Sequence, residues 1–354
     1  MKITLGDIVF GGGSTGGGGG SVSSSHPLPN GIKFVGSTWE TFNCGKYDWS
    51  QIYDASEMFS NCANLKRIDN FPKNEINGCV YMFNGCSALE SIPNGINLKP
   101  YYTIDNMFTS CTSLTEIPYF DTSKVYSFNY AWYNCKALTE FPQIDTSKCI
   151  DFSSAWSACS GLTTFPLLNT SNGTNFNYAW NECASLTEFP QLDLSNGRSF
   201  ERAWKSCSSL TTFPMLDLHN GTNFESAWAE CSSLIEFPAM DLHNGTNFTR
   251  AWDNCYALTT IGKLDLSAGT NFYSTWGVCR ALTTLGGFGA VKESISLSSS
   301  PNLTVDSLMN VITQAADLNE LGIAGKTMTL GSTNLAKLSD EQKAVATSKG
   351  WTLA

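Results

Sequence analysis

A cysteine recurs at a nearly constant interval through most of this chain, and this period restricts the fold more than any other feature. The interval is about 24 residues throughout, with one extra residue between Cys86 and Cys111. A fixed period in this range is typical of a solenoid, in which each turn buries its apolar face only by stacking on its neighbours. The ten cysteines are Cys62, Cys86, Cys111, Cys135, Cys159, Cys183, Cys207, Cys231, Cys255 and Cys279.

The residues before each cysteine predict a short helix. Apolar residues stand at positions −7, −4, −3 and 0 relative to the cysteine, and before Cys183 they are Phe176, Ala179 and Trp180. This is the i, i+3, i+4, i+7 stripe of a helix with one buried face. About two helical turns do not persist alone, so stacking must stabilise them. Position −8 carries N-cap residue types, namely Ser127, Asp151, Asn175, Ser199, Asn223, Asn247 and Asn271.

The residues after each cysteine predict a short strand. After Cys183, apolar Leu186, Phe189 and Leu192 stand at +3, +6 and +9, while Pro190 at +7 lacks the N–H that a longer ladder would need. A turn of the type Asp-Leu-Ser-Asn-Gly then returns the chain to the next unit. Parallel strands repeat every ~4.8 Å, whereas helix axes stand roughly 8–10 Å apart. We therefore expect an α/β solenoid of about ten turns that curves with its strands on the inner face.

Two pairings of core residues occur, one in the early units of the array and the other in the later units. The early units have Met at −4 and Phe at −3, as in Met58 and Phe59, whereas the later units have Ala and Trp, as in Ala131 and Trp132. One large and one small residue replace two of middling size, which keeps the core volume roughly constant. Both kinds of unit are therefore expected to share one continuous core.

The N-terminal residues differ from the repeats. Residues 1–10 are apolar but include Asp7 and lack a small-residue cleavage pattern, so they are a poor secretory signal. Residues 11–25 are almost wholly Gly and Ser, the composition of a flexible tether. We interpret residues 1–10 as a docking peptide for attachment to a particle, and a frayed terminus is the alternative. The apolar residues that would make this attachment are Ile3, Leu5, Ile8, Val9 and Phe10.

Three further regions complete the predicted organisation. Residues 26–57 are expected to form an N-terminal cap, residues 58–288 the repeat array, and residues 289–354 a C-terminal α/β cap, because solenoid ends require covering. A capping box at 339–342 opens the last helix, which ends at Gly350. Within the C-terminal cap we predict strands at 294–297, 326–330 and 351–353 and an earlier helix at 304–316.

The repeat unit resembles that of the BspA-type leucine-rich-repeat family. The resemblance rests on Cys-x-x-Leu-x-x-Ile/Phe-Pro and on Met-Phe-x-x-Cys at Met58–Cys62, Met82–Cys86 and Met107–Cys111. Residues Asp121–Val125 are similar to a turn of its surface-protein subgroup, and 326–353 to an ending shared by such proteins in gut bacteria and their phages. The later Trp-for-Phe change and the loss of Pro in the last two turns depart from the family pattern.

The resemblance implies a curved, non-catalytic scaffold for adhesion and recognition. Family members in bacteria normally carry an export signal and an anchor, whereas this sequence begins with a short peptide and a glycine tether. The leading hypothesis is therefore a phage virion fibre or decoration protein that binds a virion structural protein through its N-terminus and a host-surface glycan or protein. The alternative is a bacterial cell-surface adhesin of the BspA type. The sequence leaves self-association into a homo-oligomer open.

Charge and cysteine usage argue against several other classes. A net charge of −10 and a pI near 4.8 argue against nucleic acid as a partner, and no run approaches the roughly 20 apolar residues of a membrane span. The thirteen cysteines contain no Cys-x-x-Cys, so we expect small, buried, reduced thiols rather than a zinc site. No nucleophile–base set stands apart from the repeat, so neither an enzyme nor a cofactor is expected. Repeated Asp at +10 leaves calcium open, although turn capping explains it.

The candidate ligand-binding residues lie on the presumed strand face. At +5, Glu alternates with Thr over much of the array, which keeps carboxylates about two strand spacings apart and limits their repulsion. Gln lies close by at +8, and a merely solvated sheet face is the alternative. The candidates are Glu116, Glu140, Gln143, Glu188, Gln191 and Glu236. A rival surface on the helix side comprises Tyr130, Tyr133, Tyr178, Arg202, Arg250 and Tyr273.

Overall fold

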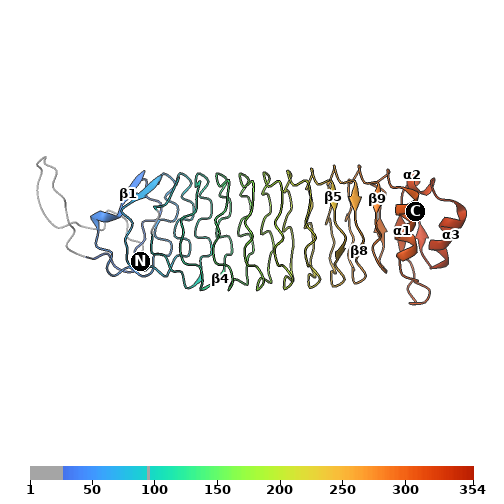
Figure 1. The fold of residues 1–354 in the computed structure, drawn as a ribbon, viewed down its shortest axis with the longest axis horizontal. Helices are drawn as coiled ribbons and strands as arrows, with labels where there is room; N and C mark the ends of the chain where they lie inside the picture. Colours follow the sequence, from blue (N-terminus) through green and yellow to red (C-terminus); the bar gives the residue numbers. More distant parts are fainter. Residues whose placement is uncertain (1–26, 94–95) are drawn as a thin grey trace, which may run out of the picture.

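The computed structural model describes residues 27–93 and 96–354, and its turns follow one another in a straight row (Figure 1). Equivalent residues of successive turns form parallel bridges, such as Asp151 with Asn175 and Asn175 with Ser199. The described chain is therefore a parallel β-solenoid whose turns match the repeat unit of the sequence. The predicted docking peptide and tether, with Ile3, Leu5, Ile8, Val9 and Phe10, lie outside the described residues.

The strands of the array are two or three residues long and pair in parallel. In the N-terminal part, β1 pairs with β2 and β3 with β4, whereas later β5, β7 and β9 form one sheet and β6 pairs with β8. Their bounds are β1 Thr41–Asn43, β2 Arg67–Asp69, β3 Tyr102–Thr103, β4 Val125–Ser127, β5 Glu236–Phe237, β6 Met240–Asp241, β7 Thr260–Ile261, β8 Leu264–Asp265 and β9 Thr284–Leu285. A short 3₁₀ helix, η1, spans Cys44–Lys46.

The prediction of a helix before each cysteine is wrong, because each such segment is a pair of consecutive four-residue turns. In one unit the turns are Phe176–Ala179 and Trp180–Cys183, and the last N–H of each donates to its first carbonyl at 3.1 and 3.2 Å. The third residues, Tyr178 and Glu182, have φ values of +59° and +60°. A positive φ at the third residue alone matches a type II turn.

The two turns reproduce the spacing of a helix by a different geometry. The first and last residue of each turn lie inside, which places apolar side chains at −7, −4, −3 and 0. The N–H groups of Phe176, Tyr178 and Trp180 donate to carbonyls of the following repeat unit, at 2.7–3.0 Å. A helix would have kept such bonds within the segment. In this segment, half of the backbone N–H bonds instead join one repeat unit to the next.

The residues at −8 cap these turns instead of helices. Asp151 Oδ1 accepts the N–H of Ser153 at 2.9 Å, and Asn175 Oδ1 accepts the N–H of Asn177 at 3.2 Å. The side chains therefore satisfy an N–H two residues on, as their residue types suggest. The segment that contains this N–H, however, is a turn and not the predicted helix.

The expected curvature is absent because, in the described part of the array, no α-helix widens one side. Successive Phe rings at −7, from Phe128 to Phe272, lie 5.2–5.9 Å apart between centroids. On the strand side, successive rings from Phe141 to Phe237 lie 5.4–6.3 Å apart. The strand side is therefore not the shorter arc, and the prediction that it lines a concave face is wrong.

The core contains the continuous row of tryptophans that the repeat predicts. From Trp132 to Trp276 the ring centroids of neighbours are 5.1–6.3 Å apart, with planes within 11°. The stack of Phe59, Phe83 and Phe108 occupies the same position in the earlier turns. These rings are buried, so both kinds of unit share one core.

All thirteen cysteines are buried and free. Each cysteine of the column from Cys86 onward donates its thiol to the carbonyl of the aromatic residue at −3 in the preceding turn, as Cys183 does to Trp156 at 3.2 Å. Burial raises the pKa of Cys159 and of Cys231 to about 12. The prediction of buried thiols is confirmed, and the thiol has a structural role as a hydrogen-bond donor between turns.

The predicted elements of the C-terminal region are confirmed, and the structure adds one short helix, α2. A capping box at Ser339 and Gln342 opens the last helix, and β10, β11 and β12 pair in parallel in that order. The role of this region as a cap stays a prediction. The bounds are β10 Ile295–Ser296, α1 Val305–Gln314, β11 Thr327–Thr329, α2 Ser332–Leu335, α3 Asp340–Ser348 and β12 Thr352–Leu353.

Within residues 27–93 and 96–354, no helix has the length and apolar character needed to span a membrane.

Candidate functional site

The predicted ligand-binding carboxylates are exposed in one column on the strand side. Glu236 lies opposite Thr260 in the register of β5 and β7, and a bridge joins it to Thr212 in the preceding turn. Glu and Thr therefore stand side by side in successive turns at this position. The column does place Glu116, Glu140, Glu188 and Glu236 on one face, and all four are exposed.

The predicted glutamines form a second column, where they alternate with exposed apolar residues. Gln143 Nε2 donates to the carbonyl of Leu167 at 3.0 Å, and Gln191 Nε2 donates to the carbonyl of Met215. Leu167 and Met215 are among the most exposed apolar side chains of the described chain. One end of each amide therefore links two turns, and its oxygen has no partner among the described residues' hydrogen bonds.

A groove of about 660 Å³ lies beside this column and crosses several turns. We call it the strand-side groove. Of the six predicted residues only Gln191 lines it, so this groove is not the site that the predicted set describes. Its polar and exposed lining residues are Gln191, Met215, Asp217, Asp241, Lys263 and Asp265. The predicted rival residues lie in the paired turns before each cysteine, which we call the turn side, and none of them lines the groove.

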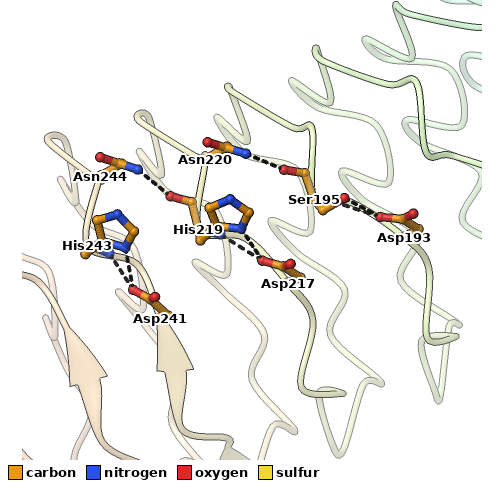
Figure 2. Close-up of polar contacts among 8 residues, drawn as sticks. All are labelled: Asp193, Ser195, Asp217, His219, Asn220, Asp241, His243 and Asn244. Carbon is orange, nitrogen blue, oxygen red and sulfur yellow. Dashed lines mark hydrogen bonds and ion pairs between the residues drawn. The ribbon is translucent and has the colours of Figure 1, made fainter.

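Each carboxylate at the groove contacts the backbone N–H and the side chain of the residue two positions further along the chain (Figure 2). Asp217 Oδ1 accepts the N–H of His219 at 3.3 Å and lies 2.5 Å from its Nδ1. Asp241 Oδ1 has the same contacts with His243, at 3.1 and 2.8 Å. Beside these side chains, Asn244 Nδ2 donates to the carbonyl of His219 at 2.9 Å and so links two successive turns. Each carboxylate therefore has one oxygen fixed by the protein.

The same contacts keep the carboxylates ionised. The hydrogen bond from the His219 side chain lowers the pKa of Asp217. Burial opposes ionisation of Asp241, but the hydrogen bonds from His243 outweigh it and lower the pKa of that carboxyl. The two imidazole rings stack with centroids 6.4 Å apart. In the described part of the chain, no group of three or more His, Cys, Asp or Glu side chains is placed to hold a metal ion.

The groove offers fixed hydrogen-bond acceptors, one ammonium donor and a thioether surface. The acceptors are Asp217, Asp241 and Asp265, and the last two face each other in the register of β6 and β8. Sequence reasoning explained these aspartates by turn capping, left calcium open at them, and did not include them among the candidate ligand-binding residues. The Asp-Leu-His motif repeated in adjacent units at 217–219 and 241–243 is the feature that could have marked them.

Comparison with known proteins gives two findings. The DUF285 family, described as a Mycoplasma protein of unknown function, matches residues 33–142 and 102–214. Among solved structures, the chain is similar to a leucine-rich repeat protein from Bacteroides ovatus ATCC 8483, with 14% identity and a TM-score of 0.38. That likeness covers 89% of this chain and 92% of the other. No curated protein matches the sequence.

Proposed function

Because this chain belongs to the DUF285 family, for which no function is described, we propose from its geometry that it is a rigid recognition scaffold that binds a cell-surface ligand without catalysing a reaction. The observation that carries the proposal is the strand-side groove, where Asp217, Asp241 and Asp265 stand in successive turns. Their orientation is fixed before a ligand arrives. Groups that are already ordered lose little entropy on binding.

The division between core and surface supports the same role. Between Phe128 and Cys255 the buried positions −7, −4, −3 and 0 carry the same residues in every turn. The outward position at +8, in contrast, changes through Gln143, Leu167, Gln191, Met215, Ala239 and Lys263. Stacking constrains the buried residues, whereas the residues that vary lie on the surface that a ligand would contact. Solenoids use such extended surfaces for binding.

The groove is tested with Asp217→Asn and Asp241→Asn in one protein, which removes two charges at nearly constant shape. Fluorescently labelled full-length protein is incubated with a panel of bacterial and mammalian cells, and bound label is measured against concentration. We expect the double variant to bind at least about tenfold more weakly, because hydrogen bonds to charged groups contribute about 1.5–3 kcal/mol.

Two matched variants separate the groove from other surfaces. Glu182→Gln removes an exposed carboxylate on the turn side and should bind like the wild type. Glu116→Gln with Glu140→Gln tests the column outside the groove, and a loss there alone would move the site to that column. Unchanged binding by every variant would contradict recognition through the strand side.

We also propose that the scaffold is a phage virion component attached through residues 1–25, and that its ligand lies on the host surface. The support is the apolar decapeptide followed by a Gly/Ser tether. Deleting residues 1–25 should abolish incorporation into purified particles and leave the circular dichroism spectrum and Tm unchanged. Incorporation at the wild-type level would contradict it. Recovery of the full chain with the envelope of the producing cell would favour the bacterial adhesin.

A further inference from the structure

An exposed aromatic and apolar patch lies in the N-terminal half of the array, away from the strand-side groove. We call it the tyrosine platform, formed by Tyr101, Tyr102, Tyr126 and Ile150, whose exposed fractions are 49, 62, 44 and 46%. The last three stand nine residues before a cysteine in three consecutive turns. The rings of Tyr102 and Tyr126 lie 6.3 Å apart with planes tilted by 32°. The next turns carry Thr174 and then Arg198 at this position, so the platform ends after three turns.

The backbone departs from the repeat at this patch. Tyr102 has a φ of +77°, and apart from Asn70 all other described non-glycine residues with positive φ lie at the two recurring turn positions. A bulky residue with positive φ is an outlier, and such strain gathers at functional sites. The register also shifts between Tyr102 and Thr103, which leaves Tyr126 of β4 without a partner in β3. Bulges of this kind redirect side chains.

A small cavity of about 130 Å³ adjoins the platform. Lys124 Nζ lies 5.0 Å from the ring centroid of Tyr101, and Lys99 Nζ bonds to Glu75 at 2.8 Å. The charged lining residues are two acids and two amines, so the cavity offers donors and acceptors without net charge. Its lining is Glu75, Asn77, Lys99, Tyr101, Asp121 and Lys124, with Pro100.

We propose that the tyrosine platform and this cavity bind a neutral sugar ring of a glycan, with the ring on Tyr102 and Tyr126 and its hydroxyl groups toward Lys99, Asp121 and Lys124. The C–H face of a pyranose is apolar and packs on an aromatic ring, whereas its hydroxyl groups both donate and accept. A charged sugar would meet one repelling group for each attracting group, so the lining gives it no net electrostatic advantage. The inference rests on the proposed recognition role, but it uses none of the residues of the groove.

A protein partner fits the patch less well. Stable protein–protein interfaces bury about 800 Å² on each partner, contributed by roughly 20–30 residues a side. The platform comprises four side chains bordered by a small polar cavity. A single sugar ring needs only a few side chains and one polar cavity, so the patch matches it in size.

The test uses the full-length protein and calorimetric titration with cellohexaose, maltohexaose, β-1,4-mannohexaose and, as the charged probe, hexagalacturonate. Tyr102→Gly removes the ring and accepts the positive φ, so its Tm should not fall. Tyr126→Ala removes the second ring, Tyr102→Phe keeps an aromatic face, and Tyr119→Ala removes a tyrosine that is 75% exposed outside the platform. We expect a neutral hexasaccharide to bind the wild type, the Phe variant and the Tyr119 variant alike, and the other two at least about tenfold more weakly.

Several results would overturn the inference. These are the absence of binding by all three neutral probes, binding of hexagalacturonate alone, or unchanged affinity in both Tyr102→Gly and Tyr126→Ala. Binding to cells that depends on the platform but is lost after protease treatment and survives periodate would indicate a protein partner instead. If the groove variant loses binding to cells while the platform variants do not, the proposed function stands and this inference fails.

Discussion

At the scale of single residues, the tryptophans and cysteines of the core are used to stack one turn on the next. The indole N–H groups of the seven stacked tryptophans, Trp132 to Trp276, have no oxygen or nitrogen acceptor in the described chain. Trp180 instead makes T-shaped contacts with Phe165 and Phe189, at 5.6 and 4.9 Å between centroids. An aromatic face is a weak acceptor for an N–H group, and this geometry allows such a contact. These buried indoles therefore serve packing, and the proposed recognition role falls to the outward-facing side chains.

The Asp217 turn predicts a pH dependence of stability. Because the hydrogen bond from His219 lowers the pKa of Asp217 below its value in the unfolded chain, the ionised carboxylate favours the folded state. This contribution is present above the unfolded pKa and is lost as the pH falls through the lowered folded pKa. Between about pH 5 and pH 2 we expect the Tm of the wild type to fall more steeply than that of Asp217→Asn.

A double-mutant cycle with His219→Ala identifies the source of this effect. If the side-chain hydrogen bond is responsible, His219→Ala should flatten the same part of the Tm curve, and the double variant should add little. Equal acid sensitivity of the wild type and Asp217→Asn would contradict the assignment.

The period identified the columns of candidate residues but not which columns meet at a site. Glu188 and Glu236 follow from counting, and both are exposed as predicted. The strand-side groove depends on the path of the chain between Gln191 and Asp193, and on which side chains that path leaves exposed, as with Met215. The bulge at Tyr126 depends on the register of β3 and β4, which the spacing of cysteines does not determine.

At the scale of elements, the sequence was ambiguous between one short helix and two tight turns. Both place apolar residues at i, i+3, i+4 and i+7. Glycine marks such a positive-φ position only at Gly85, whereas residues such as Tyr178, Glu182 and Arg202 stand at the others. Bonds to the next turn, such as the one from Glu182 N–H to Lys205 at 2.7 Å, compensate for that conformation and become visible only when the turns are stacked.

The exchange of Met-Phe for Ala-Trp predicts energetic coupling within one turn. Trp204→Phe leaves a cavity and should cost about 1–3 kcal/mol, while Ala203→Met overfills the core at a similar cost. The double variant recreates the pairing of Met107 and Phe108, both fully buried in an early turn. We expect it to be more stable than the sum of the two changes implies by at least about 1 kcal/mol. Guanidinium unfolding measures this, and strictly additive effects would contradict the volume exchange.

At the scale of the whole molecule, each turn contacts mainly its two neighbours, so the array is nearly one-dimensional. The steps along the Trp row and along both Phe rows are similar, which is why the turns stand in a straight line (Figure 1). Any interior turn should then be dispensable, provided that the register is kept.

Deletion of residues 184–207 removes one full period and joins Cys183 to Ser208. We expect a folded, monodisperse protein with an unchanged circular dichroism shape and a smaller denaturant m-value, since less surface is exposed on unfolding. Deletion of residues 184–195 removes half a period and would place polar positions in the core. It should abolish cooperative unfolding, and similar behaviour of the two deletions would contradict a register-dependent core.

The bonds between turns also give the solenoid a direction. Before the cysteine, Phe176 N–H donates to Ser199 in the following turn, whereas just after the cysteine Thr187 N–H donates to Thr163 in the preceding one. A bare first turn and a bare last turn would therefore expose complementary and unlike sets of donors and acceptors. Two such rods can join front to back, but neither end matches a copy of itself.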